Sequence, residues 1–366
     1  MGLERTSVGL DVHARSVSAA AIDGVTGELF RQRLVPDSQV VIDWVRGLPG
    51  PVAVTYEAGP TGFGLARALT AAGMRCEVAA PSKIPRPAGD RVKTDARDAL
   101  LLARLLRLDE IVAVRVPTVA QESARDLVRA REDARADLMR VRHRISKLLL
   151  RHGHVYAGGE AWTGKHEAWL RGIGFPGSQR AGTQAAYDAD LEALALTLAR
   201  RQRLDEQIAA LAADSEFTAV TRRLGCLRGI STLTGFALAV EIGDWSRFTG
   251  AGIGAYLGLV TSETSTGQSR RQGGITKTGN SHVRRLLVEA AWQHAPAYRV
   301  GPTLQARWAQ APAAARVRGH VGNQRLHARW TQLMTRRKKH TVACVAIARE
   351  LAGWCWSLAI LPDPDG

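Results

Sequence analysis

Short apolar runs alternate with amphipathic segments over residues 6–115. Four of the runs have the length and apolar content of β-strands: residues 7–13, 28–35, 52–58 and 76–81. Two further segments carry apolar residues at three- and four-residue steps and are predicted to be helices, residues 64–73 and 95–108. This alternation predicts an α/β domain, in which the first two strands lie close enough along the chain to pair as a hairpin.

A long amphipathic helix is predicted over residues 118–152, a stretch without Gly or Pro in which charged residues separate the apolar ones. A glycine-rich interval at 152–177 precedes a second helical segment at 188–217. Two long helices joined by a short insert are typical of an antiparallel coiled-coil arm, which usually serves as a dimerisation or spacer device. An ordinary helical bundle is the alternative interpretation.

Glycines interrupt the helical pattern after residue 220. Residues 227–235 resemble a helix–hairpin–helix element, whose tight turn presents backbone N–H groups to a phosphate, although plain glycine-rich turns between helices are also common. Residues 261–283 are predicted to be a polar loop, and a basic cluster at 336–339 opens an apolar helix. The expected organisation is an α/β domain (1–116), a helical coiled-coil arm with a Gly-rich insert (117–216) and a mainly α-helical domain (217–366).

The chain is strongly basic. Fifty Lys and Arg against 34 Asp and Glu give its 366 residues a formal charge of +16, and acids are few after residue 220, so the carboxyl-terminal part carries most of the surplus. Such a surplus favours a polyanionic partner, because each neutralised phosphate releases condensed counterions. A merely soluble basic protein is the alternative.

The spacing of the cysteines and the length of the apolar runs indicate in which cellular compartment the protein is expected. The four cysteines are far apart and form no CxxC pair, so we expect no structural zinc or disulfide framework, and a reducing cytoplasm fits. The amino terminus lacks the apolar run of a signal peptide, and no apolar stretch reaches the roughly 20 residues needed to span a bilayer. We therefore expect a cytoplasmic, nucleoid-associated protein with no membrane partner.

Four acidic residues stand where an α/β domain gathers functional side chains. Asp11 lies within an otherwise apolar strand, where a lone carboxylate is costly unless it binds or pairs with a cation. Glu57 ends another apolar strand, and Asp95 and Asp98 are three residues apart at the start of a helix, so that both point to one face. Convergent carboxylates would hold hard cations such as Mg²⁺ or Mn²⁺, which support phosphoryl transfer.

These acids also have simpler interpretations. Asp95 can be a helix N-cap with Asp98 in the first turn, favourable to the helix dipole, and Glu57 can pair with a nearby arginine. Capping does not explain Asp11, so the combination carries more weight than any single member. Actin-like sugar and acetate kinases also begin with a strand that ends in Asp, but residues 11–16 lack the glycine turn that cradles phosphate in those enzymes.

A polar segment near the carboxyl end combines hydroxyl, glycine and basic residues. Ser265, beside Thr266 and Gly267, is a candidate nucleophile for a phosphodiester, with arginines stabilising the developing charge. Five basic side chains form the predicted phosphate-binding neighbourhood: Arg270, Arg271, Lys277, Arg284 and Arg285. Taken alone, a Ser-Thr-Gly cluster is more often a turn than a catalytic loop.

Several motifs occur in an order that resembles the DEDD-type insertion-sequence transposases. They are GLDVH at 9–13, YEAGPTGFGLARAL at 56–69, KTDARDALLLARLL at 93–106 and the block at 229–292. The resemblance covers nearly the whole chain. It implies a RuvC-like, RNase H-fold amino-terminal domain, a separate transposase domain, and guidance by a structured non-coding RNA of the element, the bridge RNA.

The resemblance also implies roles for individual residues. The four metal-binding acids of the family fall on Asp11, Glu57, Asp95 and Asp98. The nucleophilic serine falls on Ser265; Thr266 stands where many relatives have a second serine, and Thr266 and Ser269 remain as alternative hydroxyls. The serine would bond covalently to DNA, so that donor and target strands are exchanged without ATP. The expected assembly is a homodimer or homotetramer, in which the acidic domain of one subunit meets the serine domain of another.

Three functions compete at this point. The leading hypothesis is an RNA-guided transposase or recombinase that cleaves, exchanges and rejoins DNA through a serine–DNA intermediate, assisted by a metal at the acids. The alternative is a metal-dependent, RuvC-like nuclease or resolvase, in which the serine loop only binds phosphate. A non-enzymatic nucleic-acid scaffold is disfavoured, because four clustered carboxylates would repel phosphate unless a metal neutralised them.

Overall fold

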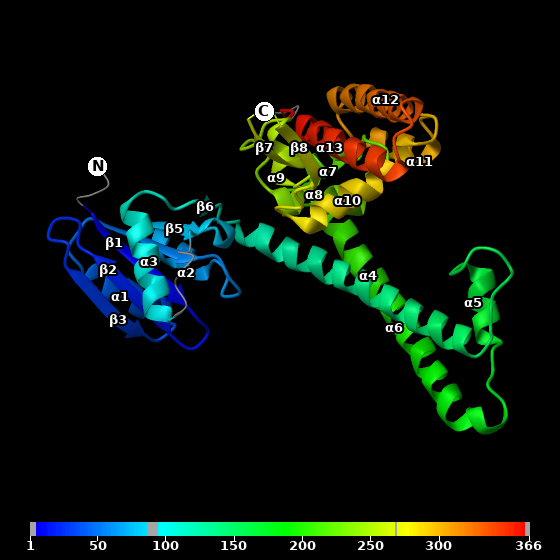
Figure 1. Ribbon diagram of the computed structural model, residues 1–366, viewed down its shortest axis with the longest axis horizontal. Helices are drawn as coiled ribbons and strands as arrows, with labels where there is room; N and C mark the ends of the chain where they lie inside the picture. Colours follow the sequence, from blue (N-terminus) through cyan, green and yellow to red (C-terminus); the bar gives the residue numbers. More distant parts are fainter. Residues whose placement is uncertain (1–4, 86–93, 268, 363–366) are drawn as a thin grey trace. The chain divides into compact units, whose positions relative to one another are not determined.

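The computed structural model describes residues 5–85, 94–267 and 269–362 (Figure 1). The chain divides into two compact units, residues 1–118 and 119–366. Each unit buries apolar side chains of its own.

One mixed sheet organises the described part of the first unit. Its strands are β1 (Thr6–Val12), β2 (Val17–Ile22), β3 (Leu29–Leu34), β4 (Val52–Glu57), β5 (Arg75–Ala79) and β6 (Ala113–Val114). They lie in the order β3-β2-β1-β4-β5-β6, with β1, β4 and β5 parallel and the other neighbours antiparallel. The order 3-2-1-4-5 agrees with the RNase H-like fold that the sequence resemblance implies.

The predicted hairpin between residues 7–13 and 28–35 was wrong. β1 pairs with β2, and β3 pairs with the other edge of β2. β2 has the sequence Val-Ser-Ala-Ala-Ala-Ile, and alanine and serine lack the branched or aromatic side chains that mark a strand in a sequence. Small side chains are suitable here because α3 packs closely over β1 and β2.

Helices cover both faces of this sheet: α1 (Ser38–Arg46), α2 (Gly64–Ala71) and α3 (Asp95–Arg107), with a short helical turn at Pro81–Lys83 (Figure 1). The face that carries Val8 and Leu10 packs against α1 and α2. Because side chains alternate along a strand, Gly9 and Asp11 point to the opposite face, which α3 covers. The sheet thus directs Asp11 toward the helix that begins at Asp95.

Gly9 allows α3 to approach β1 closely. A Cβ at this position would lie 2.1 Å from the Ala99 carbonyl oxygen and 2.4 Å from the Ala103 amide nitrogen. These are backbone atoms of α3, so they can make room only if the helix itself shifts. We expect Gly9→Ala to push α3 off the sheet and lower the free energy of unfolding by about 1–3 kcal/mol. Thermal denaturation checks this against Gly64→Ala, where the new Cβ meets no described neighbour within 4 Å. Equal melting temperatures for the two variants would contradict the prediction.

Two long helices form an arm in the second unit, as the sequence predicts: α4 (Val119–Arg151) and α6 (Ala185–Ala213) (Figure 1). They run antiparallel, because Val128 near the start of α4 packs with Ile208 near the end of α6. At the other end of the arm, Ile145 packs with Tyr187. The connection between them contains α5 (Gly164–Arg171) and short helical turns at Gly177–Gln179 and Arg180–Gln184.

Helices also dominate the rest of this unit, as predicted: α7 (Thr218–Leu224), α8 (Thr232–Ile242), α9 (Gly252–Tyr256), α10 (Ser281–Ala291), α11 (Pro302–Ala309), α12 (Ala313–Thr335) and α13 (His340–Ala359), with a 3₁₀ turn at Trp292–His294. α13 packs against α7, α10 and α12, and its Ile347 and Leu351 are fully buried.

Among the described residues, α13 is one helix whose length and composition would allow it to cross a membrane. This finding corrects the expectation that no apolar stretch reaches that length. The stretch is easily missed in the sequence because Arg349 and Glu350 interrupt it. Half of its most apolar window is buried inside the protein, so the apolar residues of α13 contribute to the core of the second unit.

Residues 261–283 are not the loop that their polarity predicts. β7 (Thr261–Thr266) and β8 (Ser269–Ile275) form an antiparallel hairpin, which we call the serine hairpin, and α10 follows it. Nearly all of its residues are exposed. An exposed hairpin shows no apolar alternation, so the hydrophobic pattern could not reveal it.

The two helices expected around the glycine-rich turn at 227–235 are present as α7 and α8. In the turn, Gly229 has a φ of +84°, and a Cβ there would lie 2.5 Å from the Ala290 carbonyl oxygen of α10. The glycine therefore permits close packing of the turn against α10. Contact between this turn and a phosphate stays a prediction.

Candidate functional site

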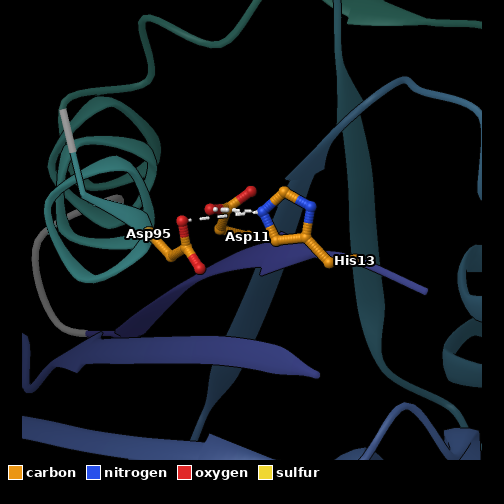
Figure 2. A group of neighbouring side chains, drawn as sticks. All are labelled: Asp11, His13 and Asp95. Atoms are coloured by element: carbon orange, nitrogen blue, oxygen red, sulfur yellow. Dashed lines mark hydrogen bonds and ion pairs between the residues drawn. The ribbon is translucent and has the colours of Figure 1, made fainter. Parts of the chain in front are cut away.

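Asp11, His13 and Asp95 come together at one edge of the first sheet (Figure 2). Asp11 lies near the end of β1, His13 follows that strand, and Asp95 is the first residue of α3. The Nε2 atom of His13 lies 3.2 Å from Oδ2 of Asp11 and 3.7 Å from Oδ1 of Asp95. One ligand atom from each residue lies within 4.8 Å of the others, so a single ion can contact all three.

Glu57 belongs to the same edge of the sheet. In the parallel ladder between β1 and β4, Leu10 pairs with Tyr56. The next residue on each strand is Asp11 and Glu57, respectively, so the two acids stand side by side at the carboxyl ends of neighbouring strands. The register thus brings together two acids that are far apart in the sequence.

Electrostatics favour a cation at this edge. Burial raises the pKa of Asp11, and the negative charges of Asp95 and Asp98 raise it further. His13 acts in the opposite direction, through its charge and its hydrogen bond. Because partly desolvated carboxylates repel one another, a divalent cation would be stabilised between them. The residues therefore fit a divalent metal: the oxygen ligands suit Mg²⁺ and Mn²⁺, and the nitrogen ligand favours Mn²⁺ over Mg²⁺.

N-capping does not explain Asp95. The N-cap of α3 is Thr94, whose φ of −141° is extended, and Asp95 is one residue further into the helix. Its carboxylate faces His13 instead of capping the helix. Asp98, also in the first turn, does favour the helix dipole. The dipole interpretation therefore coexists with a metal site, whereas the N-cap interpretation was wrong.

Ser265 lies on β7 and faces away from the other two candidate hydroxyls. It stands opposite Arg270 on β8, whereas Thr266 stands opposite Ser269. Because side chains alternate between the two faces of a strand, Ser265 alone of these three hydroxyls shares a face with Arg270. Its Oγ donates a hydrogen bond of 2.8 Å to Glu263.

The predicted phosphate-binding residues of the hairpin region differ in their surroundings. Arg270 forms an ion pair with Glu263 at 3.0 Å. Arg271 is exposed on the face opposite Ser265, and Lys277 is exposed in the segment that follows β8. These exposed cations can reach a polyanion without unfolding any part of the unit.

Arg284 and Arg285, on α10, are engaged inside the second unit. Arg284 donates to the carbonyl oxygens of Leu257 and Thr278 at 2.9 and 2.7 Å. Arg285 forms an ion pair with Glu132 of α4. Both guanidinium groups hold α10 in place, so phosphate binding by them would require these contacts to be shared or broken.

Glu241 ties the arm to the start of α10. Its side chain is 2% exposed and accepts two hydrogen bonds of 3.1 Å from Arg129 of α4 and one of 2.9 Å from Asn280. Asn280 is also the N-cap of α10. Burial would raise the pKa of Glu241, but hydrogen bonds from His282, Arg129 and Asn280 outweigh it and lower the pKa to about 2. The segment that follows the serine hairpin is thereby fixed to the arm.

Comparison with known proteins places both regions in one family. Residues 8–153 match a family model for DEDD transposases, described as Transposase, and residues 221–309 match the model described as Transposase IS116/IS110/IS902 family. The first match contains the acidic cluster, and the second contains the serine hairpin.

Relatives of known sequence agree with this assignment. The chain is 41% identical over 305 residues to a protein of Sinorhizobium fredii described as Putative transposase y4qE. The aligned residues cover 83% of this chain and 74% of that protein. It is 30% identical over 347 residues to the Transposase for insertion sequence element IS1533 of Leptospira borgpetersenii. That alignment covers 91% of this chain and 97% of the relative. A Probable family 20 transposase of Pseudomonas aeruginosa is 27% identical, in an alignment that covers 98% of this chain and 97% of that protein.

An acidic cluster on an RNase H-like sheet and these similarities define the class of the protein: it is a transposase, an enzyme that processes DNA. More specifically, the chain belongs to the IS116/IS110/IS902 family of insertion-sequence transposases, with a DEDD amino-terminal region and the carboxyl-terminal region characteristic of that family.

Three residues at these sites were missed from the sequence. His13 stands two residues after Asp11, and an imidazole at that spacing was a usable signal. Glu263 stands two residues before Ser265, and predicting a strand there would have placed both on one face. Glu241 is a lone acid in the apolar helix α8, so the reasoning that singled out Asp11 applies to it equally.

Proposed function

We propose that this transposase moves its own insertion element by RNA-guided cleavage, exchange and rejoining of donor and target DNA, with a covalent Ser265–DNA bond as the intermediate. One observation carries the proposal: the chain combines a carboxylate cluster suited to a divalent metal with an exposed serine that shares a hairpin face with an arginine. A purely hydrolytic enzyme would need only the first of these.

The two sites have separate tasks. Asp11 and Asp95, with Glu57 and Asp98 at the same end of the sheet, would hold Mg²⁺ or Mn²⁺, which when bound supplies positive charge at the reacting phosphate. Ser265 provides the nucleophilic oxygen, and the arginines of the hairpin orient the phosphodiester and stabilise its developing charge. A serine–phosphate bond conserves the energy of the broken phosphodiester, so a DNA hydroxyl can later displace the serine without ATP.

Assembly and guidance complete the proposal. A homodimer or homotetramer would let the acidic site of one subunit act with Ser265 of another, and the arm formed by α4 and α6 is the element we propose for pairing subunits. The family resemblance supports a bridge RNA as the guide, and the net charge of +16 suits binding of both DNA and RNA. The place of action we propose is the cytoplasm, on nucleoid DNA.

Trapping the covalent intermediate tests the proposal. Purified protein is mixed with labelled DNA of the element ends, Mn²⁺ and a transcript of the non-coding DNA beside the gene, and the mixture is then denatured. We expect a labelled protein–DNA band from the wild type. We expect the band to fall to background in Ser265→Ala and also when the transcript is omitted.

Thr266→Ala is the matched control, because Thr266 is adjacent to Ser265 but lies on the other face of the hairpin. We expect it to keep the band. Cleavage that persists in Ser265→Ala but disappears in Asp11→Ala would support the metal-dependent nuclease instead. A band that forms equally well without the transcript would remove RNA guidance from the proposal.

A further inference from the structure

One face of the serine hairpin carries four polar side chains, three of which donate hydrogen bonds to the fourth, Glu263. Ser265 stands opposite Arg270, and Glu263 stands opposite Gln272. The carboxylate of Glu263 is the shared acceptor of this group. Its Oε1 accepts from Ser265 Oγ at 2.8 Å, and Arg270 donates to both of its oxygens, at 3.1 and 3.0 Å. Gln272 donates to Oε2 at 3.3 Å.

We propose that Glu263 is the general base that takes the proton of Ser265 as this serine attacks DNA, and that Arg270 is the positioning residue that orients Glu263. The inference rests on the proposed function, because it requires Ser265 Oγ to be the nucleophile.

The geometry meets the requirements of a nucleophile and its base. A serine hydroxyl is a weak nucleophile at neutral pH and needs an adjacent group that accepts its proton. The distance of 2.8 Å is within the range of a direct proton transfer. Arg270, which stands opposite Ser265, cannot accept a proton, because a guanidinium carries only donors. Glu263 is therefore the acceptor that the hairpin supplies.

Arg270 also adjusts the basicity of Glu263. Hydrogen bonds from Arg270, Ser265 and Gln272 lower the pKa of Glu263, so the carboxylate is ionised at neutral pH but is a weak base while Arg270 is bound to it. A phosphodiester placed at Ser265 brings negative charge within reach of Arg270. As the guanidinium is shared with the phosphate, its hold on Glu263 weakens and the carboxylate becomes more basic when the attack begins.

The step is balanced in atoms and charge. The proton of Ser265 passes to Glu263 as the Oγ–P bond forms and the P–O bond to the departing strand breaks. The departing DNA oxygen takes one proton from solvent, and the Glu263 carboxylic acid later returns one. In the rejoining step, a DNA hydroxyl attacks the phosphorus and the serine oxygen leaves as a hydroxyl.

The rate of formation of the serine–DNA adduct in a single turnover tests this assignment. Glu263→Gln keeps the size of the side chain and a hydrogen-bond acceptor but removes its basicity. We expect the rate to fall roughly 100-fold with unchanged affinity for DNA. Thr264→Ala is the matched control, because Thr264 lies between Glu263 and Ser265 but points to the other face, and we expect it to keep the wild-type rate.

Chemical rescue separates a base from a structural residue. Glu263→Ala leaves room for a small carboxylate, so added formate or acetate is expected to restore part of its adduct rate in proportion to concentration. A lack of rescue would assign Glu263 a structural role and overturn the inference. A wild-type rate in Glu263→Gln, together with loss of the adduct in Ser265→Ala, would also overturn it while leaving the proposed function intact. An adduct that survives in Ser265→Ala would instead refute the proposed function.

Discussion

Asp11→Asn is expected to slow DNA strand cleavage by roughly a thousandfold or more, because a divalent metal contributes several kcal/mol to phosphoryl transfer and each 1.36 kcal/mol is tenfold in rate. Asparagine keeps the shape of the side chain but offers a neutral oxygen. Asp11 is also the least exposed of the three clustered groups, with 20% of its side chain accessible against more than half for His13 and Asp95. Solvent can therefore compensate least for the loss of its charge.

The same substitution should not destabilise the metal-free protein. Burial raises the pKa of Asp11, which means that its ionised form is disfavoured in the folded state at neutral pH. Removing the charge relieves that cost, so Asp11→Asn is expected to melt at the wild-type temperature or above it. Mn²⁺ should then raise the melting temperature of the wild type but not that of the variant, because only a folded state that binds metal is stabilised by it.

Cleavage of labelled element-end DNA and thermal melts with and without Mn²⁺ measure both effects. Asp43→Asn is a suitable control, since this exposed acid of α1 lies outside the acidic cluster and makes its contacts within its own helix, a 2.8 Å hydrogen bond from Gln39 and a 3.8 Å ion pair with Arg46. It should change neither quantity. Cleavage by Asp11→Asn at the wild-type rate would show that the acidic cluster has no part in the chemistry.

The acidic edge could be predicted because its signals are local. An acid within an apolar strand, another at the end of a strand and two in one helical turn are each visible in the sequence, and parallel strands bring their carboxyl ends to one edge. The pairing of β1 with β2 could not be predicted in this way. β2 is recognised as a strand only through its partners, since Ser18 and the three alanines that follow it have little preference for a strand.

The serine site depends more on long-range contacts, and less of it could be predicted. The sequence indicates Ser265 and the surrounding basic residues but not the hairpin, because exposed strands have no apolar pattern. It also cannot separate an arginine that faces solvent from one that binds an acid 153 residues away, as Arg285 binds Glu132. Only the folded structure shows that Arg285 holds α10 while Arg271 is exposed.

The contacts of Glu241 join α4 of the arm to α8 and to Asn280, which follows the serine hairpin. Gln121 and Arg125 of α4 donate to the Val240 and Glu241 carbonyl oxygens at the end of α8, and Arg129 bonds to the Glu241 side chain. Basic donors at the carboxyl end of a helix also complement its dipole. A movement of the arm would therefore be transmitted to α8 and to the segment after the serine hairpin.

Glu241→Gln is expected to lower the free energy of unfolding of this unit by about 3 kcal/mol near neutral pH. The fall of the Glu241 pKa from 4.5 to about 2 implies that magnitude at 1.36 kcal/mol per unit. An amide cannot replace the carboxylate, because Arg129 donates to both of its oxygens and the NH₂ group would face a donor in either orientation. For a unit of this size the melting temperature should fall by roughly 6–12 °C.

The pH dependence of the stability difference between wild type and Glu241→Gln shows whether the ionised carboxylate causes it. A carboxylate whose pKa is lowered by folding stabilises the protein fully above its unfolded pKa, near 4.5, and loses that effect as the pH falls toward 2. The gap between wild type and Glu241→Gln should therefore be constant from pH 7 to 5 and shrink below it. Glu289→Gln, which removes the charge of a 56% exposed side chain paired with Arg285, should cost less than about 1 kcal/mol. A gap that stays constant down to pH 3 would mean that packing, and not the ionised carboxylate, joins the arm to α10.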